Sequence, residues 1–223
     1  SLAFGLPLDA EAPVKQGIQS ITPEDLEFAA SMGYRVKHLG IARRQGDRVE
    51  MRVHPTLIPE QKQLANVDGV LNAIMIKGDA VGELVLVGPG AGGAATASAV
   101  CADLADIART AAGSGPALGV PIAQLKSQAL VPAEDIESEW YVRLAASDCA
   151  GVMSDITQVL ANHDVSIESL LQNPPQEDQT TVSIVLLTQV ASASVMTAVM
   201  QEITALTEVE TEFTLLRVEA FDQ

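Results

Sequence analysis

A glycine-rich run, GPGAGG at residues 88–93, has the spacing in this sequence that most suggests chemistry. Gly88, Gly90 and Gly93 match the pattern G-x-G-x-x-G, which in dinucleotide-binding folds lets backbone approach a pyrophosphate at a helix start. The residues after the run do not predict the second parallel strand and ribose-binding acid of such a fold. Two interpretations stay open: a loop that borders a cofactor, and a tight turn from a strand into a helix.

The histidines and cysteines do not form a metal-binding or nucleophilic pattern. His38, His54 and His163 lie far apart, and none has a carboxylate or cysteine at the spacing of metal ligands. Cys101 and Cys149 form neither a metal-spaced pair nor a disulfide framework, which is typical of a reducing cytoplasm. We therefore predict a cytoplasmic protein with free thiols and no metal site.

The charge of the chain excludes polyanionic partners. Thirteen basic against 29 acidic residues give a net charge of −16, which would repel nucleic acid or an anionic membrane surface. Two long runs, 84–102 and 179–201, carry no charge, but glycines and a proline interrupt the first, and polar residues and a change of period interrupt the second. We predict no nucleic-acid partner and no membrane span.

The sequence pattern predicts two folded units of the α+β class. In the first, Thr22 and Pro23 provide a cap and a first residue for a helix that ends at Gly33. Strands rich in Val, Ile and Leu follow, joined as hairpins into a mostly antiparallel sheet, and a helix after the glycine run reaches about Arg109. The strands are predicted at 34–43, 48–57, 70–77 and 80–87.

The second unit has the order βαββαβ. Residues 113–138 contain the glycines and prolines of a linker, so we predict domains at 1–112 and 139–220. Beyond the linker, apolar residues alternate in strands and recur every three or four positions in helices. The predicted elements are strand 140–146, helix 151–162, strands 165–172 and 180–188, helix 191–205 and strand 209–218. This order in about 80 residues is the ferredoxin-like split βαβ.

The first unit resembles a known enzyme family. The runs GIQSITPEDLEFAASMGYRVKHLGIA and GDAVGELVLVGPGAGGAATASAV look like the closing part of the catalytic and dimerisation domain of bacterial homoserine dehydrogenases. In that family the glycine loop borders the nicotinamide cofactor, NADP or NAD. The resemblance implies that Gly92 contacts the cofactor and that Gly88 and Gly90 frame the loop.

The resemblance also implies that the reacting groups lie elsewhere. In the family, the general-acid/base lysine and the acids that bind homoserine lie just before the segment that resembles SLAFG, with which this sequence opens. We therefore expect the catalytic residues upstream of Ser1, identify none in residues 1–223, and predict that the 223-residue chain alone is inactive.

The second unit resembles an ACT domain. WYVRLAASDCAGVMSDITQVLANHDVSIESLLQ follows the family pattern of a strand, D-x-P-G-V/L, a helix and a second strand, with Ala150 in place of the preferred proline. The resemblance implies a small amino acid, L-threonine, bound near the helix start by Asp148, Ala150, Gly151, Val152 and Ile167. Asp148 is equally suited to cap the helix, and many ACT domains serve only in dimerisation.

Together the resemblances imply part of a homoserine dehydrogenase. That enzyme interconverts L-homoserine and L-aspartate 4-semialdehyde with NAD(P), on the route to threonine, methionine and isoleucine, and here it would be regulated through an ACT domain. We expect a dimer or tetramer formed through the sheet and the ACT domains. The alternative is a stand-alone amino-acid-binding ACT module without catalysis, which explains residues 140–218 but not the glycine run.

Overall fold

The structure, a computed structural model, consists of two compact units. It describes residues 3–7, 9, 11, 13–109, 125–172 and 180–221. The smaller unit consists of Ser1–Ala10 and Glu60–Gln128, and the larger unit of Glu11–Pro59 and Ala129–Gln223. The domain end predicted at residue 112 and part of the predicted linker lie outside the described residues, so those boundaries stay a prediction.

The larger unit is built on one eight-stranded sheet with the order β1-β3-β10-β7-β9-β8, to which β2 and β6 add by pairing with β3. The strands are β1 Val14–Lys15, β2 Tyr34–Gln45, β3 Arg48–Pro59, β6 Ala129–Leu130, β7 Glu137–Ser147, β8 Ile167–Gln172, β9 Thr181–Ser192 and β10 Val209–Val218. The last four run antiparallel, whereas β10 joins β3 in parallel with Arg217 opposite Thr56. A single sheet therefore joins β3, from the first part of the chain, to the four C-terminal strands β7–β10.

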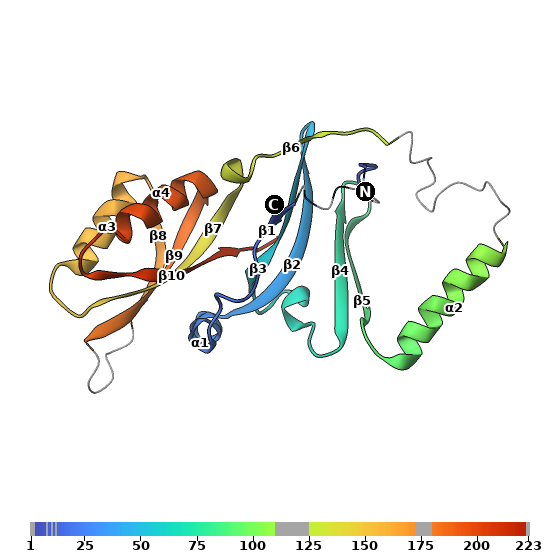
Figure 1. Ribbon diagram of the computed structural model, residues 1–223, viewed down its shortest axis with the longest axis horizontal. Helices are drawn as coiled ribbons and strands as arrows, with labels where there is room; N and C mark the ends of the chain where they lie inside the picture. Colours follow the sequence, from blue (N-terminus) through green and yellow to red (C-terminus); the bar gives the residue numbers. More distant parts are fainter. Residues whose placement is uncertain are drawn as a thin grey trace. The chain divides into compact units, whose positions relative to one another are not determined.

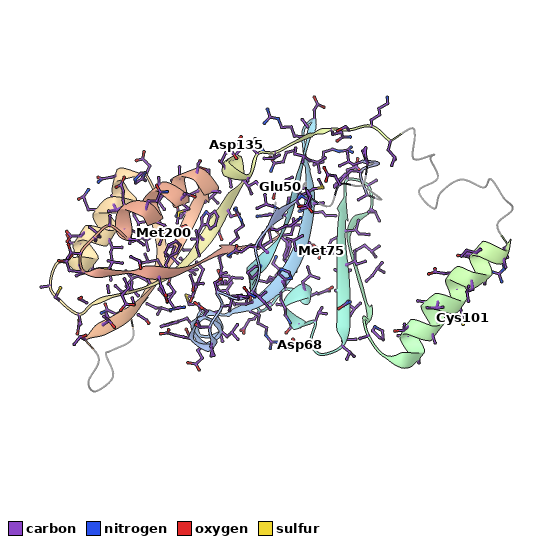
Figure 2. The ribbon with its side chains drawn as sticks, in the orientation of Figure 1. Glu50, Asp68, Met75, Cys101, Asp135 and Met200 are labelled. Atoms are coloured by element: carbon purple, nitrogen blue, oxygen red, sulfur yellow. The ribbon has the colours of Figure 1, made fainter. Side chains whose placement is uncertain are left out.

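Helices cover both faces of this sheet. Figure 1 shows α3 (Val152–Asn162) and α4 (Ala193–Ile203) side by side against the C-terminal strands. Their apolar faces form one core with Trp140 and its neighbours, and Figure 2 shows Met200, only 2% exposed, within it. Because side chains alternate along a strand, the adjacent Tyr141 belongs to a second core with α1 (Pro23–Ser31).

The smaller unit contains an antiparallel hairpin of β4 (Leu71–Gly78) and β5 (Gly82–Pro89). The long helix α2 (Gly93–Arg109) follows β5 and buries no side chain. Short 3-10 turns, η1 (Gln63–Asn66) in this unit and η3 (Ala133–Asp135) in the larger one, complete the elements. None of the described helices is both long and apolar enough to cross a bilayer.

The predicted elements are confirmed with small differences at their ends. Each predicted strand and helix is present in its predicted order, and β7-α3-β8-β9-α4-β10 is the βαββαβ unit. Thr22 caps α1 as predicted and forms a capping box with Asp25, and Gly33 follows the helix with φ of +79°. The prediction that all four strands of the first unit share one sheet is wrong: β2 and β3 join the sheet of the C-terminal strands, whereas β4 and β5 form a separate two-stranded sheet.

Candidate functional site

The strongest candidate site is a cavity of about 330 Å³ at the start of α3, which we call the effector cavity. Asp148, Ala150, Gly151 and Val152 line it, so the structure brings together four of the five residues predicted to hold an effector. The buried Val182 lies on β9 and gives the cavity an apolar wall. A small ligand with both polar and apolar groups fits such a surface.

The backbone at this helix start is open to a ligand. Gly151 is the N-cap residue of α3, its φ is +105°, and no side chain caps the helix. By contrast, Thr22 and Ser192 cap α1 and α4 through their side-chain oxygens. The first N–H groups of α3 therefore lack a side-chain acceptor and favour an anionic group such as a carboxylate.

Asp148 lines the effector cavity, whereas Ile167 does not. Asp148 is exposed and does not cap α3, so the alternative interpretation as a capping residue is not supported. Its backbone N–H donates to Thr180 O at 3.1 Å, which holds the loop against the start of β9. Ile167 does not line the effector cavity but packs against the hydrophobic core, so the geometry gives its predicted ligand role no support.

The glycine run forms the turn from β5 into α2. Gly92 has φ of +122°, and a Cβ built on Gly88 or Gly92 would meet no atom within 4 Å. A Cβ on Gly90 would lie 2.0 Å from Asn72 Nδ2, so the exposed Asn72 side chain would have to rotate away if Gly90 were replaced. Since β5 pairs antiparallel with β4, this loop is not a self-contained dinucleotide-binding fold, but its open backbone fits a cofactor that approaches from outside.

A fully buried carboxylate in the larger unit ties α1 to the sheet. Asp25 Oδ1 accepts from Arg143 Nε at 2.6 Å and from Tyr141 OH at 3.0 Å, and Oδ2 accepts from Thr22 N at 2.8 Å. Burial raises the pKa of Asp25, but the hydrogen bonds from Arg143 and Thr22 outweigh it and hold the pKa below its ordinary value. Asp25 is therefore charged and paired.

A second buried ionic cluster lies where β3 meets β10. Arg52 Nη2 lies 2.8 Å from Glu219 Oε2, and Arg52 Nε lies 2.7 Å from Glu50 Oε1 without hydrogen-bond alignment. Arg43 also pairs with Glu219. Figure 2 labels Glu50 on β3. The sequence pattern did not predict this cluster, because Glu50 and Arg52 alternate with apolar residues as solvent-facing charges do.

The histidines have separate environments. His163 is the C-cap residue of α3 and lies 2.9 Å from Glu202 Oε1, and His38 Nε2 lies 3.4 Å from Gln16 O. His54 is almost fully buried. Among the described residues, no three His, Cys, Asp or Glu side chains gather as metal ligands. The two free thiols, Cys101 and Cys149, are exposed.

Comparison with known families gives two matches along the chain. The family model described as homoserine dehydrogenase matches residues 1–105, and the model described as ACT domain matches residues 139–211. The first therefore includes the glycine loop, and the second includes the effector cavity.

Relatives match across both segments. A homoserine dehydrogenase of Neisseria gonorrhoeae is 42% identical over 99% of this chain and 51% of its own length. That of Bacillus subtilis is 33% identical over 98% of this chain and 50% of its own. The crystal structure of a homoserine dehydrogenase from Thiobacillus denitrificans has a TM-score of 0.86 and 40% identity, covering 98% of this chain and 50% of that one. The chain thus spans about half the length of the curated relatives it matches.

Proposed function

Because this chain belongs to the homoserine dehydrogenase family and carries an ACT domain after that family's region, we propose that it forms part of an NAD(P)-dependent homoserine dehydrogenase regulated by an amino acid. The substrate of the whole protein would be L-homoserine and the product L-aspartate 4-semialdehyde. The 40% identity with one structure over 98% of the chain supports this best. A stand-alone ACT module would leave the match at residues 1–105 unexplained.

The proposed role of the smaller unit is to border the cofactor. When bound, the nicotinamide cofactor, NADP or NAD, supplies the hydride chemistry. Gly92 would lie against it, because the positive φ and the open space at this residue leave backbone accessible. Gly88 and Gly90 would frame the loop.

Two glycine variants test the role of the loop in a protein that spans the full length of the relatives. Gly92→Val would place a branched side chain at φ of +122° and displace the loop, so kcat/KM for the cofactor should fall on the order of 100-fold. Gly17→Val is the control, because Gly17 is exposed outside the loop and its Cβ would meet no neighbour. Equal kinetics in the two variants would remove Gly92 from the cofactor site.

The proposed role of the effector cavity is to sense L-threonine. The uncapped N–H groups after Gly151 would bind its carboxylate, and Asp148 would accept from its ammonium group. Val182 and Ile184 provide apolar surface for its methyl group. The observation that carries this role is a helix start without a capping side chain, open to a cavity lined by an exposed carboxylate.

Thermal unfolding with L-threonine tests the effector role. A ligand at a hundred times its Kd stabilises the folded form by about 2.7 kcal/mol, which raises Tm by roughly 5–10 °C for a chain of this size. Asp148→Ala should abolish the rise, and Glu210→Ala, which removes another exposed carboxylate from the same domain, should retain it. An unchanged rise in Asp148→Ala would move the site elsewhere.

We also propose that the whole protein acts in the cytoplasm as a homo-oligomer, a dimer or tetramer. The two exposed free thiols support a reducing compartment. The hairpin of β4 and β5 exposes several large apolar side chains, Ile74, Ile76, Leu84 and Leu86 among them, which supports burial against another surface.

A further inference from the structure

A second cavity, of about 360 Å³, lies entirely within the larger unit, and we call it the junction cavity. It shares no lining residue with the effector cavity. β3, β7 and β10 contribute His54, Trp140 and Arg217, and Val14 and Leu215 add apolar surface. The cavity therefore combines a cation, an imidazole and an apolar wall near the pairing of β10 with β3.

The cation of this cavity has no ionic partner. Arg217 is only 6% exposed, its Nη1 donates to Ser138 Oγ at 3.3 Å, and its guanidinium lies 4.2 Å from the Trp140 ring centre. No carboxylate of the described residues lies within ion-pair distance of it. Burial lowers the pKa of Arg217 to about 10 and repulsion by Arg52 adds to the effect, whereas attraction by Glu50 opposes it. A buried cation of this kind is costly without an anion.

The surrounding cluster does not supply that anion. Its three guanidinium groups are Arg43, Arg52 and Arg217, and its two carboxylates are Glu50 and Glu219. Both carboxylates already pair with Arg52, and Glu219 also pairs with Arg43. Glu50 also attracts Arg217, but Arg217 is the one of these three cations without an ion pair among the described residues, so the cavity complements an anionic group.

The imidazole of His54 leaves one acceptor without a donor. Its Nδ1 lies 3.0 Å from Pro55 O and 3.0 Å from Thr56 Oγ1. A carbonyl only accepts, so Nδ1 carries the proton and Nε2 of the neutral ring is a bare acceptor. Nε2 is fully buried and has no hydrogen-bond partner among the described residues, although the side chain lines the cavity. The missing partner is a donor.

That donor is better neutral than charged. Burial lowers the pKa of His54 to about 4, and Arg52 and Arg217 repel a proton on the ring. The same positive potential would disfavour an ammonium group at Nε2. A hydroxyl group donates without adding charge. A ligand with a carboxylate for Arg217 and a hydroxyl group for His54 Nε2 therefore satisfies both side chains.

We propose that the junction cavity binds a small aliphatic hydroxycarboxylate, whose carboxylate pairs with Arg217 and whose hydroxyl donates to His54 Nε2. Val14 and Leu215 pack against its hydrocarbon part. The site lies beside the parallel pairing of β10 with β3, so the ligand would bind across the junction between the two sequence families.

Calorimetry with three probes tests the proposal on the unaltered chain. The probes are 2-hydroxy-4-methylpentanoate, 4-methylpentanoate, which lacks the hydroxyl, and L-leucine, which has an ammonium group instead. The hydroxy acid should bind at least about tenfold more tightly than the other two, because only it completes His54 Nε2 without added charge. No heat with the hydroxy acid, or equal affinity for all three, would overturn the proposal.

Two variants assign the ligand groups. Arg217→Met should abolish binding yet raise the Tm of the ligand-free chain, since a buried cation without an ion pair is replaced by an unbranched apolar side chain. His54→Phe should bind the hydroxy acid and 4-methylpentanoate equally. Asp148→Ala, at the effector cavity, should bind the hydroxy acid like the original, so a failure of the threonine site is distinguishable. Unchanged affinity in Arg217→Met would overturn the assignment.

Discussion

The carboxylate of Asp25 provides the sharpest stability prediction. Asp25→Ala removes a fully buried acceptor and leaves Tyr141 OH and Arg143 without their main partner. Breaking a buried ion pair costs about 3–5 kcal/mol. The side chain of Arg143 is 15% exposed and Glu24 Oε2 lies 3.4 Å from it, so water and Glu24 compensate in part. We therefore expect Asp25→Ala to lower the free energy of unfolding by the lower limit of that range, about 3 kcal/mol.

Urea unfolding followed by tryptophan fluorescence measures this loss in the relevant unit. Trp140 is the only tryptophan of the chain and lies in the larger unit, so its emission reports on that unit alone. Glu27→Ala is the control, since Glu27 is exposed on the same helix and its loss should cost less than about 0.5 kcal/mol. A loss below about 1 kcal/mol in Asp25→Ala would refute the assignment of the pair as stabilising.

The pH dependence of the same pair has a defined sign. The pKa of Asp25 is lowered in the folded chain from its ordinary value of 3.8. Its contribution is therefore complete above about pH 3.8 and is lost as the pH falls through the lower folded value, because the unfolded chain takes up the proton first. The difference in unfolding free energy between the original chain and Asp25→Ala should shrink only in that acidic range.

Three further outcomes are expected. Tyr141→Phe should destabilise the larger unit by about 1–2 kcal/mol in the same urea assay, because buried Asp25 loses a donor. Gly33→Ala should cost about 1 kcal/mol, because φ is +79° there. His54 should contribute stability above about pH 6.5 that falls by roughly 3 kcal/mol as the pH drops to about 4, since the unfolded chain binds the proton that the buried ring rejects. Parallel pH profiles of His54→Phe and the original chain would contradict the last expectation.

The sequence predicted the elements well because their signals are local. Alternation and three- to four-residue spacing mark which side of each element is apolar, and the Thr22 cap and Gly33 mark the ends of α1. The effector cavity at Gly151 could also be predicted from the sequence, because the loop that precedes α3 supplies four of its lining residues in one short run.

Long-range pairings were not accessible to the same reasoning. The parallel register of Arg217 with Thr56 joins positions far apart in the chain, and no local pattern specifies it. This pairing buries His54 and Arg217, which in the sequence look like a strand-end histidine and a surface charge. A charged residue at position 217, on the same strand face as Leu215, was the one available signal, since strand residues two apart share a face.

The most direct test of the proposed function is an assay of homoserine oxidation in a protein that joins this chain to the rest of the length of its relatives. We expect reduction of NADP or NAD that depends on L-homoserine and that decreases as L-threonine is added. The Asp148→Ala variant should keep the oxidation and lose the decrease. Absence of L-homoserine-dependent reduction with either cofactor would contradict the proposed function.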